Sequence, residues 1–232
     1  TNCFGNVVDI DNCIAFWKKK NIFLIFDNAG TSYTFYKGKN SCNYGNGSII
    51  SFHHTKPFGF GEGGAIIVDL KYENKIRKLL NFGIDNKNIS IYEQYWSRLG
   101  ANYKLTEISA IFILEYIKTY FEKIVIHHRE IYNFLKTNEK LFNITLFPNF
   151  ADPEKTVPMC ISLLHIKFTK QVISQLKNIN IYSRKYYIPL INTLNSSILY
   201  NKILCLPCNI DVDLNKYKDI TLFLNGWLPK FQ

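Results

Sequence analysis

A lysine and a glycine-rich turn between two short apolar runs constrain the fold of this chain most strongly. The runs extend from Gly47 to Phe52 and from Ala65 to Val68, and the segment between them carries Lys56 followed by four glycines. Short, continuous apolar runs of this length are typical of buried parallel strands. We therefore expect Lys56 at a strand end, where open α/β sheets bind their ligands.

Patterns elsewhere extend this expectation to the whole chain. A third short apolar run, Ile22 to Phe26, ends at Asp27 and predicts another buried parallel strand with a polar residue at its C-terminal edge. Strands and helices then alternate, which predicts α/β architecture. The periodicity predicts helices from Ile14 to Lys20, Tyr72 to Asn81, Leu105 to Tyr132, Thr169 to Lys177 and Leu214 to Leu228, strands from Met159 to Ile166, Ile179 to Ser183 and Ile203 to Pro207, and a long loop from Ile84 to Leu99.

The charge of the chain narrows the classes of partner. The net charge is +10 and the only dense basic run is Lys18 to Lys20, which we expect at a helix C-terminus, where cations are favoured. Scattered lysines argue against a nucleic-acid surface, whereas a basic protein suits a phosphorylated, acidic substrate. No apolar run approaches the roughly 18 to 20 residues of a membrane span, and no signal peptide opens the chain, so we expect no membrane partner and a cytoplasmic location.

Cysteines and histidines do not predict a metal site. The six cysteines are expected to be reduced thiols in that compartment. Cys205 and Cys208 form a single CxxC inside an apolar run, so we expect no zinc there. Adjacent histidines, as in His53-His54 and His127-His128, point apart in regular structure, and neither pair has helical ligand spacing.

Three polar groups at neighbouring strand ends predict a site for one flat, phosphorylated cofactor. Lys56 among apolar neighbours loses hydration of its charged form, so its pKa falls and the amine becomes nucleophilic. Asp27 is placed to keep a pyridine nitrogen protonated, as an electron-sink cofactor requires. The Ser51 hydroxyl could bind a phosphate at the other end of the ring.

Alternatives to this interpretation remain open. An isolated lysine is usually structural, and Asp27 could simply cap or turn the chain. The run from Gly59 to Gly64 matches GxGxxG, but it precedes a strand and does not open a helix, so we reject a nucleotide-binding loop.

Several ordered blocks of this sequence resemble one family. The sequence is similar to the DegT/DnrJ/EryC1/StrS family of pyridoxal-phosphate (PLP)-dependent sugar aminotransferases, which have the aspartate aminotransferase type of fold. The blocks that carry the resemblance are Phe26-Asp27-Asn28-Ala29, Ser51-Phe52 with Lys56 and Gly61-Glu62-Gly63-Gly64, Asn81-Phe82-Gly83, the run from Gly100 to Glu107, Arg184-Lys185-Tyr186-Tyr187-Ile188-Pro189-Leu190, and Leu204 to Pro207.

The resemblance implies a cofactor and a role for each matched residue. It implies that Lys56 links covalently to PLP, that Asp27 pairs with the pyridine nitrogen and that Ala29 packs on the ring. Ser51 is expected to contact the cofactor phosphate. Asn102 is expected to reach across a homodimer interface to the partner's cofactor phosphate.

The resemblance also implies a fold and a reaction. We expect the C-terminal part of a three-layer, mostly parallel PLP-binding large domain over residues 1–120, followed by a small α+β domain over 121–232. The expected reaction moves an amino group from an amino acid, glutamate by family resemblance, to a keto-sugar carried on a nucleotide. Arg184 and Tyr186 are the expected substrate contacts, and no metal is expected.

Two departures from the family pattern bear on activity. Gly30 stands where the family often has His or Gln near the ring hydroxyl. The chain starts at Thr1 without an N-terminal part that we expect to be about a third of a complete member. One alternative is therefore a catalytically silent member that acts as a binding or dimerising module, with an exposed apolar sheet edge. A PLP-dependent sugar dehydratase is the other, and Lys56 argues against it because relatives with that chemistry tend to have histidine there.

Overall fold

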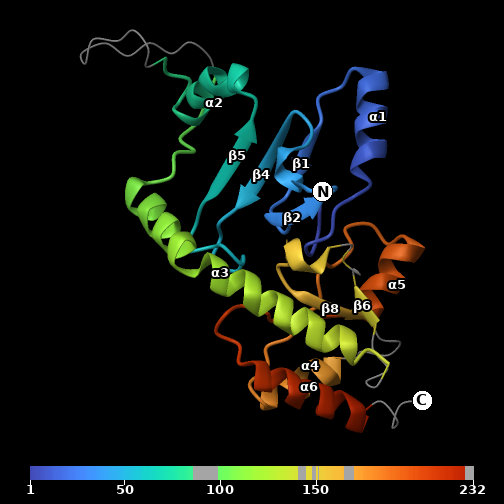
Figure 1. Ribbon diagram of the computed structural model, residues 1–232. Helices are drawn as coiled ribbons and strands as arrows, with labels where there is room; N and C mark the ends of the chain where they lie inside the picture. The colour runs from blue at the N-terminus through green and yellow to red at the C-terminus, as the bar shows by residue number, and fades with distance from the viewer. Residues whose placement is uncertain (86–98, 141–144, 148–149, 151, 165–169, 228–232) are drawn as a thin grey trace.

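The computed structural model describes residues 1–85, 99–140, 145–147, 150, 152–164 and 170–227. Figure 1 shows strands β1, β4 and β5 at one end of the molecule and β6, β8, α4 and α6 at the other, with the long helix α3 running between them. The described strands form three separate three-stranded sheets. The expected α/β class is confirmed.

The first sheet has β4 (Gly47–Ser51) at its centre. β1 (Ile25–Asp27) pairs with β4 in parallel, as expected, and places Asp27 opposite Ile49. β5 (Gly64–Val68) pairs with β4 antiparallel. The expectation that β5 is parallel is wrong, because residues 52–63 fold back as a hairpin whose two arms are joined by backbone hydrogen bonds, and such a direct connection makes its strands antiparallel.

The second sheet was not predicted. β2 (Tyr33–Tyr36) pairs with β3 (Lys39–Asn40) across a turn in which Lys37 and Gly38 both have positive φ, the backbone of a two-residue hairpin. Its other neighbour is β7 (Thr156–Val157), which comes from the second half of the chain. This pairing ties residues far apart in the sequence into one sheet.

Five of the six described helices correspond to expected ones, whereas the helix from Leu194 to Lys202 was not predicted and the first helix begins four residues before its expected start. α1 (Ile10–Lys20) begins at Asp9, whose side chain accepts a hydrogen bond from the Asn12 backbone, and the expected basic run lies in its last turn. α2 (Glu73–Leu80) follows β5, and α3 (Glu107–Thr137) begins at the capping residue Thr106. The expected domain division near residue 120 falls inside α3 and stays a prediction.

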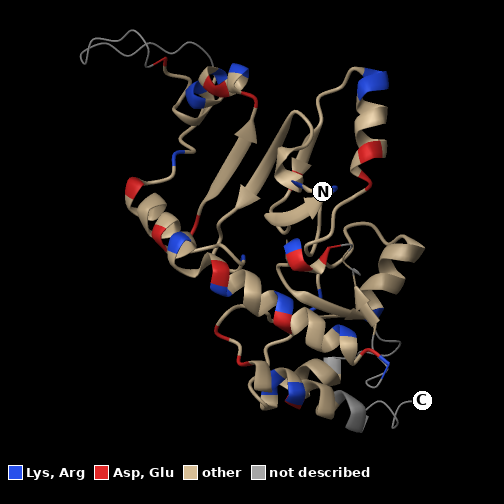
Figure 2. Ribbon diagram, in the orientation of Figure 1, with Lys and Arg blue, Asp and Glu red and all other residues tan. Residues whose placement is uncertain are grey.

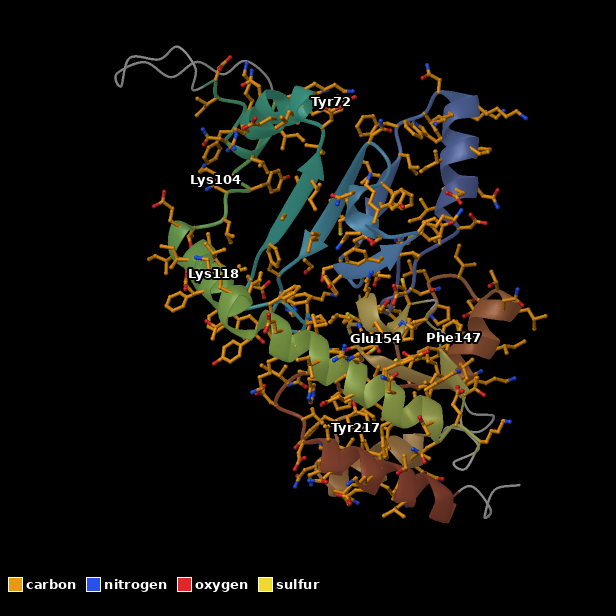
Figure 3. All side chains as sticks on the ribbon, in the orientation of Figure 1. Tyr72, Lys104, Lys118, Phe147, Glu154 and Tyr217 are labelled. Atoms are coloured by element: carbon orange, nitrogen blue, oxygen red, sulfur yellow. The ribbon has the colours of Figure 1, made fainter. Side chains whose placement is uncertain are left out.

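The C-terminal half packs helices on the third sheet. That sheet has the order β6 (Thr145–Phe147), β8 (Ile161–Leu164), β9 (Ile203–Leu206), all antiparallel. The helices of this half are α4 (Lys170–Asn178), α5 (Leu194–Lys202) and α6 (Leu214–Trp227). Elsewhere along the chain, short 3-10 turns lie at Ser41–Asn43, Leu70–Tyr72 and Pro153–Lys155. Its core contains Leu135, Leu163, Leu176, Leu204, Ile220 and Tyr217, the last of which is labelled in Figure 3.

One expected strand does not form among the described residues, and one expected loop lies largely outside them. The strand expected from Ile179 to Ser183 is wrong, because the pairing there is a single bridge between Arg184 and Cys205. Most of the long loop expected from Ile84 to Leu99 lies outside the described residues.

One face of the first sheet is apolar and open. Ile49 and Ile66 are 39% and 48% exposed, so these strands are less buried than their sequences predicted. They border a groove of about 920 Å³ that also touches Ile76 and Leu80 of α2 and Leu105. This opening is on the face of the sheet, whereas the sequence predicted an exposed apolar edge, which stays a prediction.

Charged side chains are spread over the molecule. Figure 2 shows Lys and Arg interspersed with Asp and Glu along the helices, with no continuous basic face in this view. Among the described residues, no helix is long and apolar enough to cross a membrane.

His128 on α3 predicts a loss of stability in acid. Its Nδ1 donates to the Ile124 carbonyl at 2.7 Å, and burial lowers its pKa from 6.5 to about 4. Between these two values the unfolded chain binds more protons than the folded one, so the free energy of unfolding should fall as the pH drops from 6.5 towards 4, by about 3 kcal/mol at most. Urea unfolding across this range measures the slope.

The substitution His128→Phe keeps a buried ring without a titratable nitrogen. The variant should lose this part of the pH dependence. An unchanged slope in the variant would show that other groups cause the acid sensitivity.

Candidate active site

Lys56 lies in the hairpin that joins β4 to β5. The hairpin is closed by backbone hydrogen bonds from Phe52 to Gly63 and from His54 to Gly61, both 2.8 Å long. Inside it, the Lys56 N–H donates to the His53 carbonyl at 2.8 Å, which makes a tight turn around the lysine. The sequence therefore placed Lys56 correctly at a strand end.

The glycines serve the close approach of the backbone within this turn. A Cβ atom on Gly59 would lie 1.9 Å from the His53 carbonyl oxygen, so a side chain cannot fit there. Gly61 has a φ of +70°, which favours glycine. These requirements account for two of the four glycines without a bound phosphate.

Asp27 and Ala29 reach the same place from the end of β1. One Asp27 carboxylate oxygen accepts a hydrogen bond from the Ala29 N–H at 3.0 Å, which turns the chain at the strand end. Asp27, Ala29, Gly30 and Lys56 all line a cavity of about 180 Å³. The structure thus brings together Lys56, Asp27 and Ala29, as the sequence predicted.

Asn28, which sequence reasoning missed, anchors this strand end. Its side chain is fully buried, donates to the Ser48 hydroxyl at 2.5 Å and accepts from the Asn2 amide at 2.8 Å. The Ser41 hydroxyl donates to the same Asn28 oxygen. This network fixes the backbone on both sides of Asp27. Only the position of Asn28, between two predicted site residues, could have indicated its role.

The amine of Lys56 is held by a weak partner. Its Nζ donates to the thioether of Met159 at 3.0 Å, and thioether sulfur is a weak acceptor. Burial lowers the pKa of Lys56 below its ordinary value of 10.5, while the charge of Asp27 acts in the opposite direction. Desolvation is the larger effect, so the lowered pKa that the sequence predicted is confirmed in direction.

The far wall of the cavity comes from residues to which the sequence assigned no role in the site. Met159 and Tyr187 enter from the second half of the chain, and Phe4 from the N-terminal segment. The Tyr187 ring stacks on Phe4 with ring centroids 6.0 Å apart. Tyr187 belongs to the block from Arg184 to Leu190 that carries the family resemblance, whereas nothing in the sequence marks Met159.

Arg184 and Tyr186 line a second cavity, of about 320 Å³, which also includes His54, Lys56, Met159 and Asp211. Lys56 and Met159 belong to both cavities. A ligand in the larger cavity would therefore contact the residues that border the smaller one.

Ser51 and Asn102 lie outside these two cavities. The Ser51 hydroxyl, at the end of β4, accepts a hydrogen bond from the His53 N–H at 3.3 Å. Asn102 is exposed and forms a single backbone bridge with Asn81, in the segment between α2 and α3 where Figure 3 labels Lys104. The phosphate contact of Ser51 and the interface role of Asn102 stay predictions.

All six cysteines are free thiols. The Cys208 thiol donates to the Pro158 carbonyl at 3.6 Å, and burial raises its pKa to about 12, which keeps it protonated. Cys205 is also buried and lies against Ser162, with 3.5 Å between its sulfur and the hydroxyl oxygen. These contacts fit buried structural thiols, the interpretation that the sequence favoured for the CxxC.

The residues around Lys56 fit pyridoxal phosphate. The amine has only a thioether partner, a carboxylate lines the same cavity, and Ala29 and Gly30 leave space for a flat ring. With its α/β fold and this lysine site, the chain has the features of the PLP-transferase class. Residues 1–218 match the sequence profile of the DegT/DnrJ/EryC1/StrS aminotransferase family, and the chain belongs to that family.

Individual relatives extend the comparison. The chain is 28% identical, over 239 residues, to the dTDP-4-amino-4,6-dideoxy-D-glucose transaminase of Shigella dysenteriae. The aligned region covers 91% of this chain and 60% of that relative. The fold matches that of Helicobacter pylori PseC with a TM-score of 0.81 at 20% identity, covering 98% of this chain and 65% of the other. It matches the PLP form of Spr1654 from Streptococcus pneumoniae with a TM-score of 0.85 at 15% identity, covering 97% and 66%. The chain spans about three fifths of the length of the curated relatives it matches.

The lowered pKa of Lys56 can be measured by its reactivity. Acylation of amines requires the neutral form, so the labelling of Lys56 should rise with pH around a midpoint below 10.5. Quantitative mass spectrometry of the Lys56 peptide after brief labelling gives this midpoint. The variant Asp27→Asn should lower the midpoint further, because it removes the negative charge that favours the ammonium form.

A midpoint at or above 10.5 for Lys56 would contradict the desolvated site. So would an upward shift in Asp27→Asn.

Proposed function

We propose that this chain is the PLP-binding part of a transaminase that moves an amino group from an amino acid to a keto-sugar carried on a nucleotide. The observation that carries the proposal is the shared cavity of Lys56 and Asp27, in which the lysine has a lowered pKa and a carboxylate beside it. Family membership supports the reaction class.

Three observations support a nucleotide-sugar substrate. Relatives at 28% identity are named as transaminases of dTDP- and UDP-linked amino sugars. Arg184 and Tyr186 line the larger cavity together with Lys56, and a guanidinium suits an anionic phosphate group. The net charge of +10 favours an acidic ligand as well. By family resemblance we propose glutamate as the amino donor.

Each residue of the site would have a separate role in binding the cofactor or moving a proton. When bound, PLP supplies an electron sink for the carbanion that develops on the substrate. Asp27 would hold a proton on the pyridine nitrogen, because a nearby carboxylate stabilises the positive charge of the protonated ring. The Lys56 amine would bind the cofactor and, once released by substrate, would move a proton as general base and then as acid. Ala29 would pack on the ring, and Ser51 would bind the phosphate.

The assembly belongs to the same proposal. We propose a cytoplasmic homodimer in which Asn102 reaches the partner's cofactor phosphate. Its exposed position, outside both cavities of its own chain, suits a contact made across an interface. We also propose a division into a PLP-binding domain over residues 1–120 and a small α+β domain over 121–232.

Cofactor binding tests the central residues. Titration with PLP should give a visible absorption band that Lys56→Ala abolishes, since no amine then remains to form the covalent link. Asp27→Ala should keep a lysine but weaken binding by about tenfold or more, because the ring nitrogen loses its charged partner.

Lys71→Ala is a suitable control, because Lys71 pairs with Asp69 on the surface and lines neither of the two cavities. It should bind PLP as the parent does. An unchanged band in Lys56→Ala would refute the assignment.

Mixed dimers test the role of Asn102. Lys56→Ala and Asn102→Ala variants should each lose transaminase activity, but refolding them together should restore about a quarter of the parent activity. Half of the dimers would then be mixed, and each would contain one site with intact Lys56 and Asn102.

Activity of the refolded mixture is compared with that of each variant refolded alone. If Asn102 acted within its own subunit, both sites of every mixed dimer would be damaged and no activity would return.

A further inference from the structure

The β4–β5 hairpin holds a second group of polar side chains next to Lys56. His53 and His54 each offer a ring nitrogen and Glu62 offers a carboxylate oxygen, and these three atoms lie within 4.8 Å of one another. The rings of His53 and His54 are only 4.1 Å apart between centroids. The expectation that these neighbouring side chains diverge is wrong, because the pair follows the end of β4 and lies in a turn.

The distance between His53 and Glu62 suits two ligands of one metal ion. His53 Nε2 and Glu62 Oε1 are 3.3 Å apart. Two ligands at about 2.0 to 2.1 Å from a tetrahedral ion are separated by about this much. His53, His54 and Glu62 are the residues that approach each other in this way within the part of the chain that the structure describes.

The hairpin fixes the ligands before any ion binds. The backbone bond from His54 to Gly61 links the two strands between the histidines and Glu62. His53 Nδ1 lies 2.7 Å from the Thr55 hydroxyl and accepts a hydrogen bond from the Thr55 N–H at 3.3 Å, so the ring is oriented from the side opposite Nε2. When Nε2 binds a metal ion, the proton moves to Nδ1, which then donates to the Thr55 hydroxyl, as the second nitrogen of metal-binding histidines typically does.

We propose that His53, His54 and Glu62 form a binding site for a divalent transition-metal ion of the zinc type. Two imidazoles and one carboxylate are ligands that zinc accepts, and the fourth position would be open to water, because Glu62 and His54 are exposed. The ion would neutralise the carboxylate and replace the direct contact between His53 and Glu62.

The site lies beside the lysine without using it. His54 lines the larger cavity together with Lys56, and the Lys56 N–H is bonded to the His53 carbonyl. A metal ion would therefore cross-link the two strands of the hairpin that carries the cofactor lysine. The proposal does not depend on the transaminase function, because its ligands do not include Lys56 or Asp27.

Metal titration in the absence of PLP tests the proposal. Calorimetry with Zn²⁺ and visible spectroscopy with Co²⁺ are made in a background with Cys3→Ser and Cys13→Ser, the two cysteines that are not buried. We expect one equivalent of metal and a rise in the unfolding temperature on binding. His53→Ala, His54→Ala and Glu62→Gln should each weaken binding by about tenfold or more, and Thr55→Val by about tenfold.

Two controls separate this site from other histidines and from loss of structure. His127→Ala removes one of the other adjacent histidines, whose ring centroids are 6.0 Å apart, and should bind metal as the parent does. Glu62→Gln retains the shape of the side chain, so its circular dichroism should equal that of the parent while the affinity falls. The proposal would be overturned if the parent did not bind metal stoichiometrically, or if the three ligand variants bound it with the same affinity as the parent.

Discussion

The backbone hydrogen bonds across residues 52–63 are the constraint on which the site depends. They reverse the chain between β4 and β5 and bring the Lys56 turn against the end of β1. Gly59 can make this close approach because it has no Cβ to meet the His53 carbonyl. The same hairpin gathers His53, His54 and Glu62, so one local structure positions both the lysine and the proposed metal ligands.

The chemistry of Lys56 follows from the balance of two opposing effects. Burial against apolar atoms and the Met159 thioether disfavours the ammonium, whereas Asp27 favours it. Met159 is brought there by long-range pairing, because β7 joins β2 two residues before it. Gly5, where a Cβ would lie 3.0 Å from Pro158, lets the N-terminal segment pack against the same region. The lysine site is therefore completed by the second half of the chain.

The apolar runs of the sequence predicted where strands lie and which polar residues follow them, but not how the strands pair. Asp27 and Lys56 follow short apolar strands, so their meeting at one edge could be expected from the order of the strands. The direction of β5 could not, because apolar content does not say whether a connection is a hairpin or a crossover. The prediction that the His53 and His54 side chains diverge was wrong for a related reason. Side chains alternate between two faces within a strand, but not in the turn that follows it.

The pairing of β2 with β7, and with it the cavity wall of Met159, Tyr187 and Phe4, depends on contacts between distant segments that periodicity does not encode. Family resemblance identified Arg184 and Tyr186, which do line a cavity with Lys56. It also assigned a role to Asn102. That role would be in the site of a partner subunit, so the structure of a single chain cannot test it.

The residue that carries the cofactor tests the account most directly. After incubation with PLP and reduction with borohydride, peptide mass mapping locates the lysine that bears the added group. We predict that the modification lies on Lys56, at one equivalent per chain. Modification spread over exposed lysines, or concentrated on a lysine other than Lys56, would contradict the central claim.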